Sequence, residues 1–75
     1  MSESNYWQQV AGQVRAEMAR QRKTTAELAT TLGVHKETAR FRLNGERPFG
    51  LIELAKVAAW LQVDIDALAG SEAVA

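Results

Sequence analysis

The chain has 75 residues and a mass of 8.3 kDa, with 47% hydrophobic and 24% charged residues. This balance is typical of one globular domain with a single small core, and it leaves little room for a deep pocket with a catalytic constellation, so we expect no enzyme. The sequence contains no Cys and only one His, so it excludes disulfides and thiolate metal sites, and we expect neither a metal nor a cofactor.

The sequence shows no targeting or membrane segment. Its longest apolar runs, residues 57–61 and 67–69, are far shorter than a membrane span. Its first residues lack the basic and apolar start of a signal peptide. We therefore expect a cytoplasmic protein that makes no membrane contact.

Charge is unevenly distributed along the chain, although the nine basic and nine acidic residues give a formal net charge of 0. Residues 1–14 carry −1, residues 15–47 carry +4 and residues 48–75 carry −3. A basic middle and an acidic C-terminal third suit a molecule with separated charges that binds nucleic acid. A mixed, solvated surface would have the same totals.

Glycines and one proline divide the chain into short segments without strand-like alternation, which predicts five helices and no sheet. The predicted helices span about residues 4–21, 24–32, 36–44, 51–61 and 64–69. In the first helix, Val10, Val14 and Met18 form a buried stripe. Gly12 interrupts that helix at a cost of about 1 kcal/mol relative to Ala, which indicates close packing there.

The later helices carry recognisable end signals. Thr24 and Glu27 have the spacing of a capping box, and Gly33 supplies a left-handed residue where the second helix ends. Asp64 is a suitable N-cap for the short fifth helix. The fourth helix has five apolar residues on one face that we expect to point inward: Leu51, Leu54, Val57, Ala58 and Leu61.

Residues 25–45 have the pattern of a helix-turn-helix, whose second helix enters the major groove of DNA. Ala29 is small where two helices cross, and Gly33 allows a tight turn. The segment's other apolar residues are expected to share one core: Leu28, Leu32, Val34, Ala39 and Leu43.

This segment resembles the lambda repressor/Cro-type family, also called Xre-like, and its residues 42–49 look like actinobacterial and phage members. The matching features are residues 24–28, Leu-Gly-Val at 32–34, Asn44-Gly45, and Leu54, Ala58, Leu61 and Val63. The resemblance implies an all-α, five-helix, lambda-repressor-like bundle. Its DNA-binding domain would span residues 10–69, after the start of the first helix at 1–9 and before a frayed tail at 70–75.

Several positions depart from the family pattern. His35 stands where Ser or Thr usually caps the recognition helix, and Thr25 replaces a frequent Gln whose side chain touches a phosphate in the family. Arg42 occupies a usually apolar position, and Leu43 one that is often Glu. These two changes indicate that the core contact of the third helix is shifted by one residue.

The outward face of the third helix supplies the candidate base contacts, which are Lys36, Glu37, Arg40 and Phe41. Arg40 can donate two hydrogen bonds to guanine, or it can pair with Glu37 one turn away. Phe41 can press on thymine methyl groups, or it can cover a neighbouring apolar patch. Glu37 accepts from cytosine or only orients Arg40, and Lys36 reaches a base edge or a phosphate.

Polar and basic residues around this helix are candidate phosphate contacts: Arg22, Lys23, Thr25, Thr38, Arg42, Asn44 and Arg47. Thr25 starts a helix, where free amides favour an anion. Arg22 and Lys23 would equally suit a solvated helix end, and Arg42 would equally lie along the core with its guanidinium in water.

The sequence predicts a transcriptional regulator, a repressor of Cro type, that binds double-stranded operator DNA without a small-molecule ligand. A weak homodimer is expected through Trp60, Ile65 and Leu68, although Trp60 would equally close the monomer core. Two other functions remain open. One is the DNA-binding antitoxin of a toxin–antitoxin pair, and the other is a helix-turn-helix that contacts only proteins.

Overall fold

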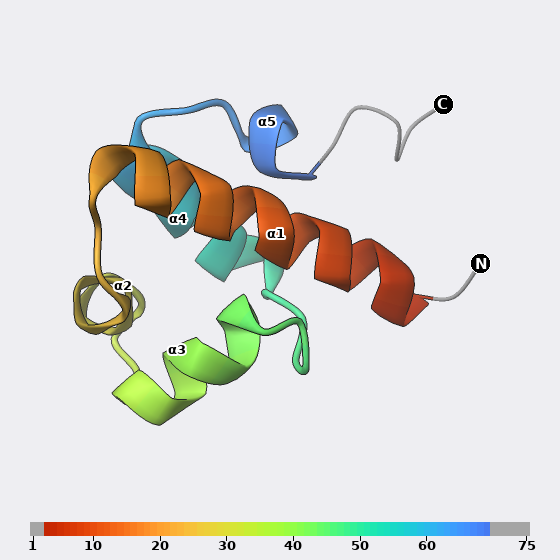
Figure 1. Ribbon diagram of the computed structural model, residues 1–75, viewed down its shortest axis with the longest axis horizontal. Helices are drawn as coiled ribbons and strands as arrows, with labels where there is room; N and C mark the ends of the chain where they lie inside the picture. Colours follow the sequence, from red (N-terminus) through yellow and green to blue (C-terminus); the bar gives the residue numbers. More distant parts are fainter. Residues whose placement is uncertain (1–2, 70–75) are drawn as a thin grey trace.

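The computed structural model describes the backbone of residues 3–69 and the side chains of residues 6–69, and the predicted tail at 70–75 lies outside them. The described chain consists of helices and loops, without a strand, which confirms the all-α class (Figure 1). The five helices are α1 (Glu3–Gln21), α2 (Thr25–Leu32), α3 (Lys36–Leu43), α4 (Leu51–Leu61) and α5 (Ile65–Ala69). None of these helices is long and apolar enough to span a membrane.

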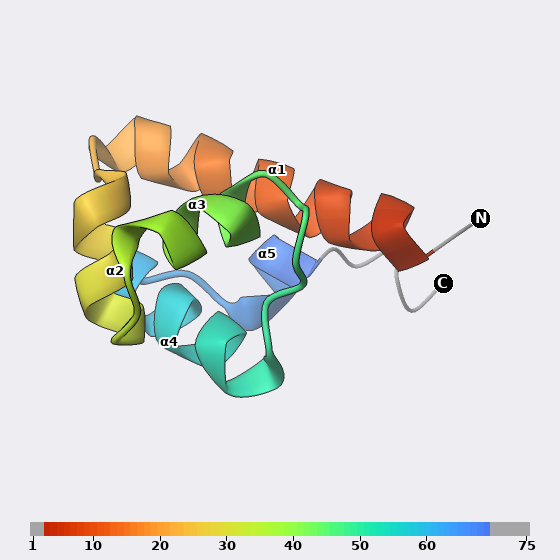
Figure 2. The ribbon, with the colours of Figure 1, turned by 90° about the horizontal axis from the view of Figure 1, so that it is seen from below.

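The helices surround one core. The long α1 crosses the molecule and packs against α3, α4 and α5, while α2 packs against α3 and α4. Seen from below, α2 lies at the left edge, α3 lies in front of the other helices, and the loop after α3 leads to α4 (Figure 2). This arrangement leaves one long face of α3 uncovered by the other helices.

The core consists of apolar side chains from every helix and from the loop before α4. The predicted stripe of α1 is confirmed, because Val10, Val14 and Met18 are at most 5% exposed. Leu28, Leu32, Ala39 and Leu43 are buried as predicted, and Val34 packs against them while partly buried. Phe49 is the largest fully buried side chain, although its loop position gave no periodic signal in the sequence.

Two expectations about α1 and α4 are wrong. Leu51 was expected to face inward, but it is 78% exposed at the first position of α4, and the buried Phe49 two residues earlier is the side chain that reaches the core there. Gly12 was expected to mark close packing, but a Cβ there would meet only the guanidinium of Arg15 at 3.6 Å. Leu54, Val57, Ala58 and Leu61 do form the buried face of α4.

One residue of the predicted dimer surface, Leu68, is also corrected. Leu68 is 2% exposed, because α5 packs on α1 and α4, so its side chain belongs to the core and not to an interface. Trp60 and Ile65 are partly buried and pack against the same core. The structure thus favours the alternative in which Trp60 closes the monomer core.

Candidate nucleic-acid interface

The unit of α2, turn and α3 is built by local hydrogen bonds that the sequence predicted. The N–H of Thr24 donates to Glu27 Oε1 at 2.7 Å and the N–H of Glu27 donates to Thr24 Oγ1 at 3.1 Å, which completes the capping box. Gly33 ends α2 with φ of +73°, and its N–H donates to the carbonyls of Ala29 and Thr30. The chain therefore turns sharply enough for α3 to begin three residues later.

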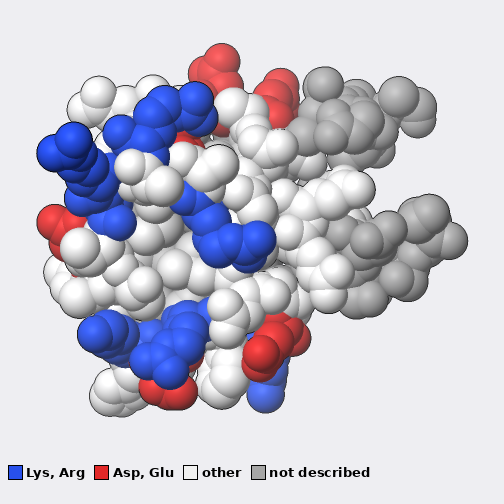
Figure 3. Space-filling model, in the orientation of Figure 1, with Lys and Arg blue, Asp and Glu red and all other residues white. Residues whose placement is uncertain are grey.

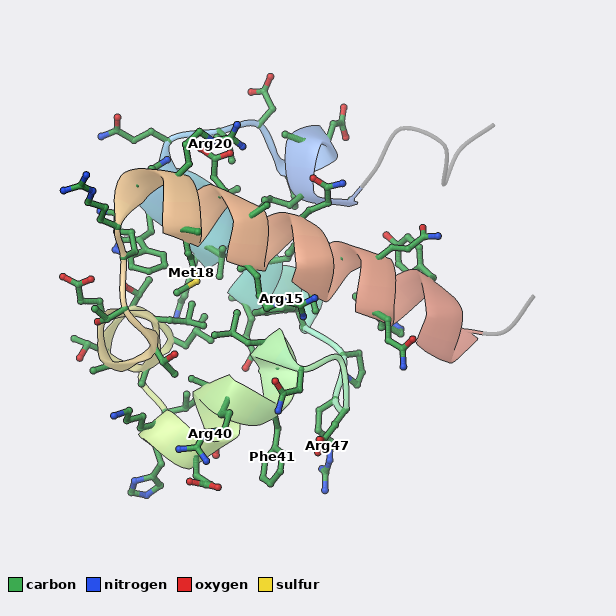
Figure 4. The ribbon with its side chains drawn as sticks, in the orientation of Figure 1. Arg15, Met18, Arg20, Arg40, Phe41 and Arg47 are labelled. Atoms are coloured by element: carbon green, nitrogen blue, oxygen red, sulfur yellow. The ribbon has the colours of Figure 1, made fainter. Side chains whose placement is uncertain are left out.

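The outward face of α3 is exposed where the sequence predicted base contacts. Ala39 and Leu43 hold the inner face, with exposures of 0% and 7%. Arg40 and Phe41 point away from the body of the protein, and Phe41 is 38% exposed (Figure 4). The exposed residues of this face include all four predicted base contacts, which are Lys36, Glu37, Arg40 and Phe41.

Arg40 and Glu37 form an ion pair, which the sequence analysis gave as the alternative to a guanine contact by Arg40. Arg40 Nη1 lies 3.4 Å from Glu37 Oε2, and the two side chains are 53% and 63% exposed. An exposed pair of this kind contributes about 0–1 kcal/mol, so a stronger acceptor readily competes for the guanidinium. The pair orients Arg40 without occupying it fully.

The predicted phosphate contacts differ in how accessible they are. Arg22, Asn44 and Arg47 are exposed, and Arg47 points to the same side as Phe41 (Figure 4). Thr25 and Thr38 are half-buried at the starts of their helices. His35 precedes α3 without a side-chain capping bond, so the imidazole does not replace the usual Ser or Thr.

Lys23 has a partner within the protein. Its Nζ lies 5.2 Å from the centroid of the Trp60 ring, which is a cation–π contact between the loop before α2 and α4. Lys23 is half-buried as a result, and its predicted phosphate contact would have to compete with this ring. Trp60 is covered from outside by the same contact.

Arg42 forms an ion pair with Glu53, a residue that the sequence analysis did not select. Its Nε donates to Glu53 Oε1 at 3.0 Å and its Nη2 donates to Glu53 Oε2 at 3.3 Å. The hydrogen bonds from Arg42 lower the pKa of Glu53 below its ordinary value of 4.5, against the opposing effect of partial burial. Nε and Nη2 of Arg42 are thus engaged by Glu53, so the predicted phosphate contact of Arg42 would have to compete with this pair or use the remaining N–H groups.

Two polar side chains of α1 also contact distant backbone. Arg15 Nη1 donates to the carbonyl of Leu43 at the end of α3, and Gln21 Nε2 donates to the carbonyl of Leu61 at 2.8 Å. A cation at a helix C-terminus is favoured by the helix dipole. The spacing of Arg15 within α1 could have marked it as facing α3, but the sequence does not identify its acceptor.

The charges are sorted over the surface in the way that the sequence totals suggested. Basic side chains gather over the C-terminal end of α1, over α3 and over the loop after it, while acidic side chains lie beside α5 (Figure 3). Acidic groups also stand among the basic ones along the α3 side, including the pair partner of Arg40. Among the side chains of residues 6–69, no group of three or more acidic or His residues could hold a metal ion.

The family model of the BetR domain matches residues 3–75, which is nearly the whole sequence. The chain belongs to the BetR domain family. Searches of curated proteins and of solved structures gave no match. The match therefore covers all five helices, including the exposed face of α3.

Proposed function

We propose that the chain is a sequence-specific, double-stranded DNA-binding transcriptional regulator, a repressor of the lambda repressor/Cro type, that acts in the cytoplasm. In this function α3 lies in the major groove, and operator occupancy excludes polymerase or a competing repressor. The observation that carries the proposal is the exposed outer face of α3 directly after a tight turn from α2.

The side chains of that face match the chemistry of base edges. Arg40 supplies a forked donor for guanine, and exposed Phe41 supplies an apolar surface for a thymine methyl group. Lys36 at the start of α3 donates to a base or a phosphate, and Glu37 accepts from cytosine or orients Arg40. A helix of eight residues suffices to present these groups to one stretch of groove.

The exposed groups around α3 suit the phosphate backbone. Arg22, Asn44 and Arg47 flank the reading face, and Thr25 lies at the start of α2. Arg42 is the weaker candidate of this set because Glu53 already binds two of its guanidinium nitrogens. Two copies on a palindromic site would have centres about 34 Å apart, but Leu68 contributes nothing to their contact because it is buried.

One observation favours a second candidate function, a helix-turn-helix that contacts only proteins. Leu51 and Ile52 are 78% and 72% exposed, and together with Phe41 they are the exposed large hydrophobic residues of the described chain. A protein partner would cover such side chains. The basic residues around α3 favour DNA over this candidate, because a protein partner has no general need for them.

The test is a titration of duplex DNA at several salt concentrations. Residues 15–47 carry +4, so a protomer that neutralises about four phosphates should give a slope of log K against log salt near −3.6. Absence of any duplex affinity at about 50 mM salt would contradict DNA binding and leave the protein-contact function. A shallow slope with measurable affinity would mean that few of the basic residues touch phosphate.

A further inference from the structure

Few side chains of α3 itself are buried. Its buried residues are Ala39 and Leu43, four positions apart on one line along the helix. It packs closely on α2 and on α1, whereas α4 is not among its close packing partners. Two anchors on a line resist sliding of the helix better than they resist its rotation about that line. Contacts outside this apolar packing can therefore add to the restraint on the rotation of α3.

Such contacts come from two guanidinium groups near the C-terminal end of α3. Arg42 projects from α3 and binds Glu53 of α4 through both carboxylate oxygens, with side-chain exposures of 20% and 24%. Arg15 projects from α1 and donates to the carbonyl of Leu43. A forked arginine–carboxylate pair fixes direction as well as distance, because both groups are planar.

Glu53 is itself held in position by the backbone. Its Oε1 also accepts the N–H of Gly50 at 3.0 Å, at the start of α4. The same carboxylate therefore fixes the start of α4 and the direction of Arg42. Since Arg40, Phe41 and Arg42 are consecutive residues of one helix, a rotation of α3 that breaks the Arg42–Glu53 pair also redirects Arg40 and Phe41.

We propose that the Arg42–Glu53 pair sets the rotation of α3, and that both residues are positioning residues for base reading which do not themselves touch DNA. This role rests on the proposed function, because that function assigns α3 to the major groove. The pair makes the direction of the reading side chains a property of the α3–α4 junction, which lies outside the helix-turn-helix itself.

The test compares Glu53→Gln with Glu46→Gln. Gln at position 53 keeps an oxygen for the N–H of Gly50, but it loses the charge and turns one acceptor of the fork into a donor. Glu46 is an exposed carboxylate in the loop after α3, and the structure shows no ion pair for it within residues 6–69. The control therefore makes the same charge change nearby without touching the fork.

Two DNA probes are used, a duplex selected by the wild-type chain from a randomised library and a duplex of random sequence. Relative to Glu46→Gln, Glu53→Gln should bind the selected duplex about tenfold more weakly and the random duplex equally well. A purely structural role would lower both affinities by the same factor, in step with the melting temperature. An unchanged ratio of the two affinities would overturn the inference.

A second variant examines the other half of the pair. Arg42→Met keeps an apolar stem over the core and removes the fork, and it should lower the same affinity ratio as Glu53→Gln. The double variant should be no worse than either single variant, because the two residues act as one unit. Additive losses would show independent roles, such as a phosphate contact by Arg42, and would overturn the inference.

The experiments distinguish a failure of the proposed DNA-binding function from a failure of the proposed restraint on α3. If the wild-type chain binds neither duplex, the proposed function fails and the role in base reading fails with it. Hydrogen exchange of the α3 amides then still tests whether the Arg42–Glu53 pair restrains α3, because this measurement needs no DNA. Faster exchange in Glu53→Gln than in Glu46→Gln supports the restraint, and equal exchange rates overturn it.

Discussion

Arg40, Arg42 and Arg47 lie close together in the sequence but occupy three different environments. Arg40 is exposed beside Glu37, Arg42 is half-buried on Glu53, and Arg47 is exposed in the loop after α3. Only the position of each side chain on the fold separates them, because the three guanidinium groups are chemically identical. Our proposals therefore give base reading, positioning and phosphate binding to three chemically equivalent residues because their surroundings differ.

Arg40→Ala should reduce affinity for the selected duplex far more than for random DNA, with a loss of discrimination of about 1–3 kcal/mol. The reason is that Arg40 faces outward from α3, where base edges would lie. Arg47→Ala is the matched control and should weaken binding to both duplexes equally, because phosphates carry no sequence information. Fluorescence anisotropy on both duplexes measures the two ratios, and equal ratios would place the reading face elsewhere.

Acidification should weaken the contribution of Glu53 to stability. Arg42 lowers the pKa of Glu53 in the folded protein below its ordinary value of 4.5, so the folded state binds this proton more weakly than the unfolded chain. The contribution is complete above pH 4.5 and is lost as the pH falls through the lower, folded-state pKa. We expect the wild type to be more stable than Glu53→Gln at neutral pH. Thermal unfolding should show that this difference in stability becomes smaller as the pH is lowered to about 3. A difference that is constant with pH would contradict this linkage.

At the scale of the elements, the helices differ in how their ends are capped and in where glycine is required. The N-terminus of α2 has a complete capping box, whereas α3 begins after His35 without a side-chain cap. Gly33 and Gly45 both have positive φ, so each lies in a conformation that suits glycine. Gly12 does not require glycine in this way, because it lies inside α1 and there is room for a Cβ at its position.

Gly12→Ala should therefore raise the free energy of unfolding by about 0.5–1 kcal/mol, since Ala loses less backbone entropy in a helix and its Cβ would lie 3.6 Å from Arg15 Nη2, an ordinary van der Waals distance. Gly45→Ala is the contrasting variant and should lower stability. Its φ is +78°, and a Cβ there would lie 2.9 Å from Gln8 Cγ and 3.1 Å from Gln8 Cα. Urea denaturation measures both changes, and a destabilising Gly12→Ala would reveal packing that the structure does not show.

At the scale of the whole molecule, one small core supports all five helices. Phe49 contributes its largest fully buried side chain, from the loop that joins α3 to α4. The loop is therefore anchored inside the bundle, and the junction that holds the Arg42–Glu53 pair is part of the core architecture. Loss of this anchor would affect the bundle as a whole.

Phe49→Ala should destabilise the protein by about 3–5 kcal/mol, because it removes a fully buried aromatic ring and leaves a cavity. Stabilities of small domains are of the order of 5–15 kcal/mol, so most of the margin would be lost. Phe41→Ala is the matched control and should change stability by less than about 1 kcal/mol, because that ring is partly exposed on α3. Differential scanning calorimetry distinguishes the two, and similar melting temperatures for both variants would contradict the burial of Phe49.

The sequence by itself determined the helices and most of the core. Val10, Val14 and Met18 recur at the helical period, and Gly33 marks a helix end through its backbone freedom, so these are local properties of neighbouring residues. The exposure of Arg40 and Phe41 followed in the same way, because burial of Ala39 and Leu43 directs them outward.

Only the tertiary structure decided the contacts between residues far apart in the chain. Glu53 binds Arg42, Lys23 lies over Trp60, and Leu68 is buried between α5 and its neighbours. No period or spacing encodes such pairs, because they depend on how the helices cross in space. Phe49 is buried from the loop before α4, whereas Leu51 is exposed at the first position of α4. The path of the chain into α4, and not its local composition, decides which of these two side chains meets the core.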